Sequence, residues 1–391
     1  MHVAELAIFH VRIPLKRTIR HASHARRETD NLVVRCRLDS GQVGYGEGVP
    51  REYVTGETLD ATWGRLKALR WNELFRSAVR SFPQAIDGVQ HLSIPADVDD
   101  ARQCRTNAGR CAVELALLDA YGQAFNNPLS AVAGLAFPQL SETRSRVQYS
   151  GAITSADGFK LRLAATAMRL YAFAHLKVKV GIEGQDDVKR LATIRKIVGP
   201  KMEIRIDANE AWKPQEVVER IRELEPSGIC SVEQPIAHEQ IQCLKEVRKQ
   251  VRTPIMHDES LCSMVDAEAT VRDQTCDLFN LRLSKCGGFV PTLAIAEFAR
   301  QHAIGYQLGC QVGETAILSA AGRHFATSVS GIRWCEGSYD KRLVKERLAT
   351  KDISFGYGGW APALARGGLG IQIDPAALER VTLRREVLYA R

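Results

Sequence analysis

Charged residues recur at a nearly constant interval through the middle of this chain, each at or just past the end of a short run rich in β-branched residues. They are Lys179, Asp207, Glu233, Asp258 and Lys285, at spacings of 28, 26, 25 and 27 residues. A strand, a helix and two loops take about this many residues, so each interval is predicted to be one βα unit. The carboxyl ends of consecutive parallel strands meet at one mouth of a barrel. The pattern therefore predicts an α/β barrel with three carboxylates between two lysines at its mouth.

The hydrophobic periodicity divides the chain into two domains. Short apolar strands alternate with helices over residues 147–340, beginning with the strand VQYSGAI at 147–153. The N-terminal part alternates like antiparallel strands, with a turn at Asp39-Ser40-Gly41, and then becomes helical. We expect an N-terminal α+β domain at 1–140, a barrel at 147–340 and a glycine-rich tail at 345–391 that folds back onto the N-terminal domain.

Composition and charge favour a cytoplasmic enzyme without nucleic-acid or membrane partners. The net charge is +8, but the basic residues are spread along the chain and mixed with acids, as on solvated helix faces. No apolar run approaches the roughly 18 residues of a membrane helix, and the start of the chain lacks the features of a signal peptide. The ten cysteines are scattered and include no CxxC pair, which favours buried thiols in a reducing compartment.

The three carboxylates predict a metal site. Asp207, Glu233 and Asp258 would present oxygen ligands from three successive strands. Hard oxygen ligands without a cysteine or histidine partner favour Mg²⁺ or Mn²⁺ over zinc. A magnesium ion with three protein ligands keeps coordination positions open for water and for a substrate.

The lysines on either side are candidate bases. Lys177 and Lys179 lie two apart on one strand, so their side chains share a face, and Lys285 reaches the same cavity from the opposite wall. Mutual repulsion, the metal and desolvation are expected to lower the basicity of these lysines. The set predicts removal of a proton next to a carboxylate, with the metal stabilising the resulting enediolate.

These residues and their surroundings resemble the enolase superfamily and, within it, the muconate lactonizing enzyme subgroup. The motifs cover nearly the whole chain, in the family's order: GYGEG, ELALLDAYGQ, KVKVG, RIDAN, VEQP, DES, NLRLSKCGG and GGLGIQID. The resemblance implies a (β/α)7β modified TIM barrel with an N-terminal α+β capping domain. It also implies that Asp207, Glu233 and Asp258 bind Mg²⁺, that Lys179 and Lys285 are the acid/base pair, and that Lys177 is an electrostatic helper.

The residues of the sixth and seventh strands separate this subgroup from the mandelate racemase branch. That branch uses a histidine on the seventh strand, whereas AIGYQLG has none at its carboxyl end and the sixth strand ends in Lys285. The resemblance further implies a small-molecule carboxylate substrate, and members of the family are often oligomers.

Several residues near the predicted mouth are candidates to bind the substrate or to support the lysines. Asn209 would bind a metal-bound water or a lysine, and Glu259 is a better partner for a lysine than a metal ligand. Glu336 ends the eighth strand and either lines the pocket or caps a loop. His257 is expected to face the core or a helix, and Gly287-Gly288 to permit close packing rather than to bind phosphate.

Two loops of the N-terminal domain, at 19–29 and 49–58, are expected to cover the barrel mouth. They carry Arg51, Tyr53 and His24 as candidates to meet a remote anionic or polar group of the substrate. The alternative is that most such residues are only solvated.

The catalytic residues leave the specific reaction open. A muconate-type cycloisomerase is placed first, because the region around Glu336 resembles those enzymes. The alternatives are a racemase or epimerase of N-acylamino acids or dipeptides, and a dehydratase of the o-succinylbenzoate synthase type. Dipeptide epimerases of the subgroup carry Asp-x-Asp on the eighth strand, where this chain has Cys335-Glu336-Gly337-Ser338. A non-catalytic homologue is disfavoured because no lysine or ligand is lost.

Overall fold

The computed structural model describes residues 1–20, 25–96 and 99–391. Its largest sheet has eight parallel strands in the order β12-β11-β10-β9-β8-β7-β6-β5. The Ser150 amide donates a hydrogen bond of 2.8 Å to the Cys335 carbonyl, and Tyr149 bridges Cys335, so the first and last strands meet and the sheet closes into a barrel. The strands are β5 (Gly151–Ile153), β6 (His175–Lys179), β7 (Glu203–Asp207), β8 (Ile229–Glu233), β9 (Ile255–His257), β10 (Leu278–Leu281), β11 (Gly305–Leu308) and β12 (Ile332–Cys335).

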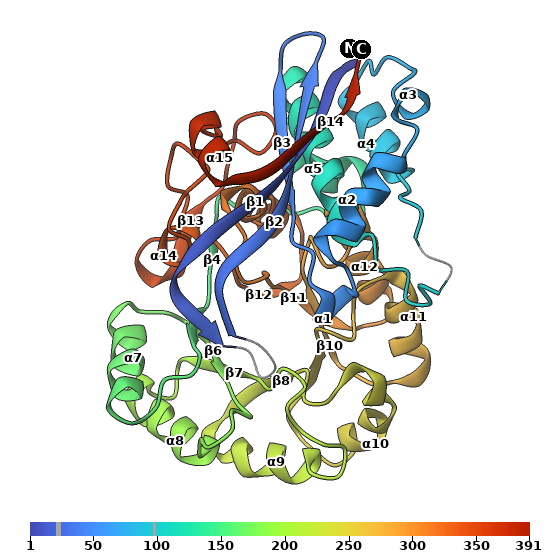
Figure 1. Ribbon diagram of the computed structural model, residues 1–391. Helices are drawn as coiled ribbons and strands as arrows, with labels where there is room; N and C mark the ends of the chain where they lie inside the picture. The colour runs from blue at the N-terminus through green and yellow to red at the C-terminus, as the bar shows by residue number, and fades with distance from the viewer. Residues whose placement is uncertain (21–24, 97–98) are drawn as a thin grey trace.

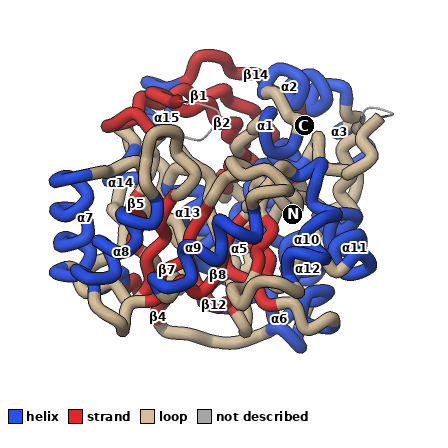
Figure 2. The backbone as a smooth tube through the Cα atoms, turned by 90° about the horizontal axis from the view of Figure 1, so that it is seen from below, coloured by secondary structure: helices blue, strands red, loops and turns tan. Residues whose placement is uncertain are grey.

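Each of the first seven barrel strands is followed by a helix, which confirms the predicted (β/α)7β barrel. Figure 2 shows helices such as α7, α8 and α11 outside the strands. Directly after β12 the chain forms the four-residue helix α14 (Asp340–Leu343) instead of a longer barrel helix. The seven helices are α7 (Gly158–Leu170), α8 (Asp187–Val198), α9 (Val217–Leu224), α10 (Leu244–Arg248), α11 (Met264–Asp273), α12 (Phe289–Gln301) and α13 (Ala316–Ser328).

An antiparallel sheet in the order β14-β1-β2-β3 forms the second layer of the molecule. The last strand pairs with the first, so the two termini lie side by side at the far end of this sheet from the barrel (Figure 1). Its strands are β1 (Val3–Arg20), β2 (Ala25–Leu38), β3 (Val43–Gly48) and β14 (Thr382–Ala390). The helices outside the barrel include α1 (Glu52–Thr55), α2 (Leu59–Ala68), α3 (Trp71–Leu74), α4 (Phe82–Gln90), α5 (Asn107–Ala124), α6 (Ala131–Ala136) and α15 (Pro375–Val381).

Alternating glycines allow strand β3 to lie directly against helix α5. A Cβ atom on Gly46 would lie 1.9 Å from the Ala112 carbonyl oxygen, and one on Gly48 the same distance from that of Ala108. Residues two apart on a strand share a face, and residues four apart on a helix do the same. The glycines of GYGEG therefore serve backbone packing, and α5 becomes a buried helix between the sheet and the barrel.

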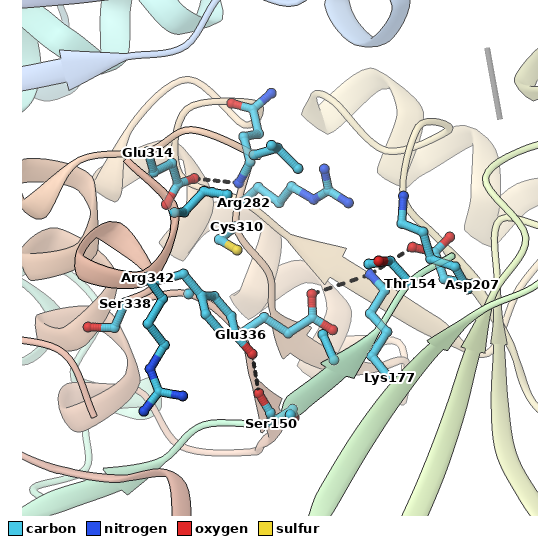
Figure 3. Close-up of a pocket in the computed structure, with 18 of the residues that line it drawn as sticks. Ser150, Thr154, Lys177, Asp207, Arg282, Cys310, Glu314, Glu336, Ser338 and Arg342 are labelled. Carbon is cyan, nitrogen blue, oxygen red and sulfur yellow. Dashed lines mark hydrogen bonds and ion pairs between the residues drawn. The ribbon is translucent and has the colours of Figure 1, made fainter. Parts of the chain in front are cut away.

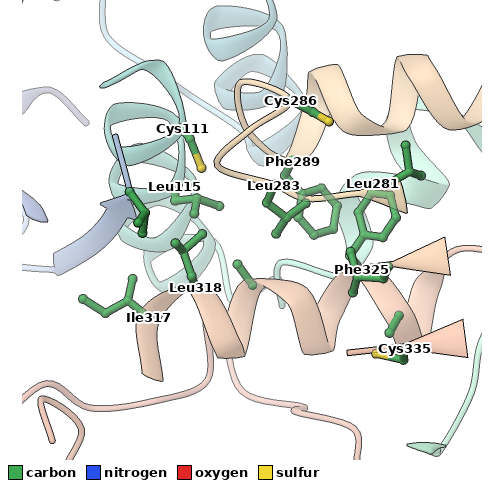
Figure 4. Close-up of a cluster of buried hydrophobic side chains, with 14 of the residues drawn as sticks. Cys111, Leu115, Leu281, Leu283, Cys286, Phe289, Ile317, Leu318, Phe325 and Cys335 are labelled. Atoms are coloured by element: carbon green, nitrogen blue, oxygen red, sulfur yellow. The ribbon is translucent and has the colours of Figure 1, made fainter. Parts of the chain in front are cut away.

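A packed apolar layer joins α5 to the barrel. Figure 4 shows Cys111 and Leu115 of α5 facing side chains from β10, α12 and α13. Phe289 and Phe325, on α12 and α13, meet edge to face with ring centroids 5.3 Å apart. All four side chains are buried. The contact packs α5 against α12 and α13 of the barrel.

Two sequence-based expectations about strands need correction. The predicted strand at 147–153 is divided into β4 (Arg146–Gln148), which pairs with β13 (Trp360–Pro362), and β5 in the barrel. The division falls at Tyr149, whose amide bonds to the Gly359 carbonyl while that of Ser150 bonds to Cys335. The predicted loop at 19–29 is also mostly strand, because β1 and β2 pair along a long hairpin that reaches the barrel mouth (Figure 1).

Two further expectations are confirmed. All ten cysteines are free, and each is buried or half-buried. His257 is buried and bonds through Nδ1 to Thr270 Oγ1 of α11, so it faces a helix. Over the described ranges, none of the helices combines the length and apolarity needed to cross a bilayer.

Candidate active site

The charged residues predicted from the sequence do lie along one rim of the barrel. Lys179 pairs in register with Asp207, and Asp207 with Glu233, so three neighbouring strands end at one level. Asp258 directly follows β9, and Lys285 comes four residues after β10. In the strand order, β6 and β10 are four strands apart in a closed barrel of eight. The two lysines therefore come from opposite walls, with the three acids on the strands between them.

Lys177 lies among the carboxylates. Its Nζ atom is 2.9 Å from Asp207 Oδ2, 2.8 Å from Glu233 Oε1 and 3.3 Å from Glu336 Oε2. Burial alone would lower the pKa of Lys177, but attraction to the carboxylates, that of Asp207 foremost, outweighs it and raises the pKa well above its usual value. This ammonium group is thus a permanent positive charge, as its predicted role as an electrostatic helper requires.

Arg282 is a second cation in this position and was not among the residues predicted from the sequence. Its guanidinium contacts Asp258 Oδ2 and lies 3.6 Å from Glu233 Oε1. Arg282 directly follows β10, just as Asp258 follows β9. The rule that found the acids, a charge immediately past a strand end, would have found Arg282 as well.

The two candidate bases differ in environment. Lys285 is fully buried, and its Nζ donates to Asp258 Oδ1 at 2.8 Å and to the backbone carbonyls of Asp258 and Asn280. Burial acts to lower the pKa of Lys285, but the charge of Asp258 raises it overall. Lys179 instead faces the cavity and donates to Asn209 Oδ1 at 2.5 Å.

Only Lys179 has the lowered basicity expected for all three lysines. Burial lowers the pKa of Lys179, Lys177 lowers it further by repulsion, and Asp207 offsets this only in part. The expectation was wrong for Lys177 and Lys285 because each has a carboxylate within hydrogen-bonding distance. Charge pairing therefore outweighs desolvation at those two positions.

The end of the eighth strand belongs to a buried polar network. Glu336 Oε1 accepts a hydrogen bond of 2.9 Å from Arg205, which also donates to Ser150 Oγ at 2.8 Å and contacts Gln307. Attraction to Lys177 and Arg205 lowers the pKa of Glu336 in spite of its burial, which acts the other way. Glu336 lines the cavity, but its charge is already neutralised by two cations.

Acids of the metal set have divergent pKa values. Burial, followed by the charge of Asp207, raises the pKa of Glu233 to about 8. The pKa of Asp207 is lowered, because attraction to Lys177 and Lys179 exceeds the effect of burial. The pKa of Asp258 is lowered more strongly, mainly by Arg282 and Lys285 against the effect of burial.

A cavity opens between the barrel mouth and the N-terminal sheet (Figure 3). Glu233, Asp258 and Lys285 are buried and do not line it. In Figure 3 Lys177 and Asp207 lie on one side, Ser338 and Arg342 on the other, and Glu336 and Arg282 between them. The residues of the sequence-based set that line it are Tyr53, Lys177, Lys179, Asp207, Asn209, Glu259 and Glu336.

The structure places the other predicted substrate-binding residues as follows. Arg51 is 2% exposed, and its guanidinium donates to the carbonyls of Asp30, Pro50 and Val312, so it ties loops together away from the cavity lining. His24 lies outside the described residues. Glu259 lies 3.5 Å from Asn209 Nδ2 and lines the cavity beside Lys179.

The three acids supply the right kind of donor atom for a divalent cation and lie on adjacent strands. Their side chains are not gathered around one point in this structure. Asp207, Glu233 and Asp258 are hard oxygen donors on adjacent strands, the kind of ligand that Mg²⁺ binds. In the described part of the chain, no three His, Cys, Asp or Glu side chains are gathered closely enough to hold a metal ion. Lys177 and Arg282 lie between the carboxylates instead, so metal binding would require these two cations to move aside.

Comparison with known proteins agrees with this geometry. A family model described as enolase C-terminal domain-like matches residues 160–377, more than half of the chain. The chain belongs to the enolase superfamily. It is an enzyme of the metal-dependent isomerase and lyase class in that superfamily, as the resemblance of its motifs implied.

Its relatives include several isomerases. An L-Ala-D/L-Glu epimerase of Clostridium acetobutylicum is 31% identical over 323 residues, which cover 82% of this chain and 86% of that protein. An N-succinyl-L-Arg/Lys racemase of Bacillus cereus is 26% identical over 393 residues, 99% of this chain and all of that protein. The structure of a dipeptide epimerase from Cytophaga hutchinsonii, complexed with Mg and D-Ala-L-Val, has a TM-score of 0.84 at 25% identity over the full length of both chains. A chloromuconate cycloisomerase of Cupriavidus pinatubonensis is 25% identical over 95% of this chain and 96% of that protein.

Proposed function

We propose that this protein is a racemase or epimerase that inverts the α-carbon of an N-acylated amino acid. The observation that carries the proposal is the placement of Lys179 and Lys285 on opposite walls of the barrel, with three carboxylates on the strands between them. A base on each face of an α-carbon can remove a proton from one side and return one from the other.

The residues of the chain account for the proton movements. Lys179, whose pKa is lowered, accepts the α-proton, and the electron pair of the broken C–H bond passes into the substrate carboxylate. Lys285, whose pKa is raised, would turn its Nζ from Asp258 toward the cavity and donate a proton to the opposite face of the same carbon. This turnover leaves Lys179 protonated and Lys285 neutral, and in that form of the site the roles are exchanged for the other enantiomer.

The acids and Lys177 supply the electrostatic part of the site. Mg²⁺, or Mn²⁺, held by Asp207, Glu233 and Asp258 would stabilise the negative charge that develops on the substrate carboxylate. Lys177 lies beside Asp207 and Glu233 in this structure and would move aside, with its positive charge, when these carboxylates hold the metal. Asn209 orients Lys179 through the hydrogen bond to its Nζ.

The far part of the cavity favours an acylated amino group over the free ammonium of a dipeptide. Glu336 is neutralised by Lys177 and Arg205. Glu314 also lines the cavity, but burial raises its pKa to about 8, so that it is largely uncharged at neutral pH. Neither carboxylate is available as a counter-ion for an ammonium group. The N-succinylamino acid racemase, which matches over its whole length, supports the same choice.

Cycloisomerisation of a muconate-like diacid is the second candidate. It uses the same kind of site, and a cycloisomerase matches over 95% of the chain. Two epimerase relatives are 31% identical to this chain, against 25% for the cycloisomerase, which is why racemisation is placed ahead of the reaction first expected from the eighth strand.

Proton NMR in D₂O with Mg²⁺ tests the proposal. N-succinylamino acids, dipeptides, muconates and a succinylbenzoate precursor would be supplied separately. Loss of the α-proton signal together with loss of optical rotation, for the acylated amino acids above all, would support it. A lactone signal from muconate without α-proton exchange in the others would replace it with cycloisomerisation.

A further inference from the structure

One face of helix α5, in the N-terminal domain, carries three polar side chains in a largely apolar helix. Asn107, Arg110 and Glu114 are three and four residues apart, so they share a face. Asn107 is 7% exposed and Glu114 is fully buried, while the Arg110 side chain is 13% exposed. Buried polar side chains require hydrogen-bond partners, so the partners of these three residues show what this face of the helix holds in place.

All three side chains bond to the backbone of the segment that carries Lys285. Asn107 Nδ2 donates to the Lys285 carbonyl at 2.7 Å, and Arg110 donates to the Gly287 carbonyl at 2.6 Å. Glu114 Oε1 accepts from the Val290 amide at 2.8 Å. Successive residues of the helix face therefore hold successive backbone groups between 285 and 290.

The glycines of this segment permit the close approach. Gly288 has φ +126°, and a Cβ atom there would lie 2.6 Å from the Glu114 carboxylate. The Asn107 amide additionally donates to the Cys262 carbonyl at 2.7 Å. Cys262 lies four residues after Asp258, so one side chain connects the loop of Lys285 with the loop of its carboxylate partner.

We propose that Asn107, supported by Arg110 and Glu114, is the positioning residue for Lys285, so that the N-terminal domain sets the geometry of one of the two bases. This rests on the two-base function proposed above. Lys179 is held differently, by its own strand β6 and by Asn209 at the end of β7, within the barrel. Disturbing α5 should therefore impair proton transfer at one face of the substrate only.

The test is α-proton exchange in D₂O, with Mg²⁺, from each enantiomer of the best N-succinylamino acid separately. Lys285→Ala defines which enantiomer depends on Lys285. Asn107→Ala and the similarly sized Asn107→Leu should slow exchange of that enantiomer by about 10²-fold, as expected for a base displaced by about 1 Å, and leave exchange of the other within about twofold. Gln123→Ala is the matched control, because it removes a side-chain amide bond to the Val43 carbonyl at the other end of α5.

Amide hydrogen exchange of residues 283–290 provides a readout that does not depend on activity. Faster exchange there in both Asn107 variants, and not in Gln123→Ala, would support the proposal. Equal loss of exchange from both enantiomers, or unchanged protection of this segment, would overturn it. If the wild-type protein processed no substrate, the proposed function would fall, and the amide exchange alone would decide whether α5 holds the segment.

Discussion

The barrel and the N-terminal domain bury their carboxylates in opposite ways. In the barrel, Asp207, Asp258 and Glu336 are paired with lysines and arginines, and their pKa values are lowered. In the N-terminal domain, Glu57 and Asp119 accept hydrogen bonds mainly from backbone amides, and burial raises their pKa values to about 7 and about 6. The paired barrel acids are therefore kept as anions near a reaction site. Glu57 and Asp119 instead hold backbone segments of the N-terminal domain in place through hydrogen bonds. Glu233 and Glu314, each with a pKa of about 8, are exceptions in the barrel.

The largest effect is expected from removing either base. Lys179→Ala and Lys285→Ala should each lower the racemisation rate at least about 10³-fold, within the range of general acid–base catalysis, while both variants remain folded. Steady-state polarimetry measures the rate, and circular dichroism the fold. Lys189→Ala, at an exposed position on α8, is the control. Near-normal activity in either base variant would contradict the two-lysine mechanism.

Removing Arg282 tests whether the barrel acids need their protein cations. Arg282→Met leaves Asp258 and Glu233 buried with less positive charge beside them. We expect the free energy of unfolding to fall by about 3 kcal/mol, the loss usual when one partner of a buried pair is removed. Urea denaturation without metal measures it. Arg248→Met, which removes a partly exposed partner of Asp277, should cost about 1 kcal/mol or less. Equal losses would show that Arg282 is not an essential partner.

Asp207→Asn tests the metal assignment directly. The change should weaken Mg²⁺ binding at least about tenfold, because even partners outside the ligand set cost that much. Isothermal titration calorimetry measures the affinity. Glu246→Gln, at an exposed site on α10, should leave it unchanged. The same affinity in Asp207→Asn and wild type would remove Asp207 from the ligand set.

The smallest effect is a pH dependence in the N-terminal domain. The folded-state pKa of Glu57 is raised from 4.5 to about 7 by burial, so the native state binds the proton more tightly than the unfolded state. Its contribution to stability is fully present below pH 4.5 and is lost as the pH rises through 7, with a slope of at most about 1.4 kcal/mol per pH unit.

Comparing Glu57→Gln with wild type isolates this slope. Denaturant unfolding between pH 4.5 and 7.5 should show a weaker decline with rising pH in Glu57→Gln than in wild type. Asp60→Asn, whose side chain is exposed, should keep the wild-type slope. Parallel curves for Glu57→Gln and wild type would mean that Glu57 does not bind a proton on folding.

The sequence by itself determined the barrel and the level of its charged rim. Strand-end charges at a constant interval place Lys179, Asp207 and Glu233 on one mouth of any closed parallel sheet, because each interval is one strand and one helix. His257 and the Gly287-Gly288 pair were also assigned correctly, since strand phase decides which way a side chain points and a glycine pair indicates close packing.

Only the tertiary structure decided which charges pair and what holds them. Arg282 and Lys177 lie between the acids, and Lys285 is buried against Asp258. The Arg51 guanidinium donates hydrogen bonds to backbone carbonyls such as that of Val312. The tie from Asn107 to Lys285 joins residues 178 positions apart in the chain. The phase of a strand sets which way each side chain points and at which level of the barrel it lies. It does not set the distance between side chains across the barrel or between domains, and hydrogen bonds and pKa values depend on that distance.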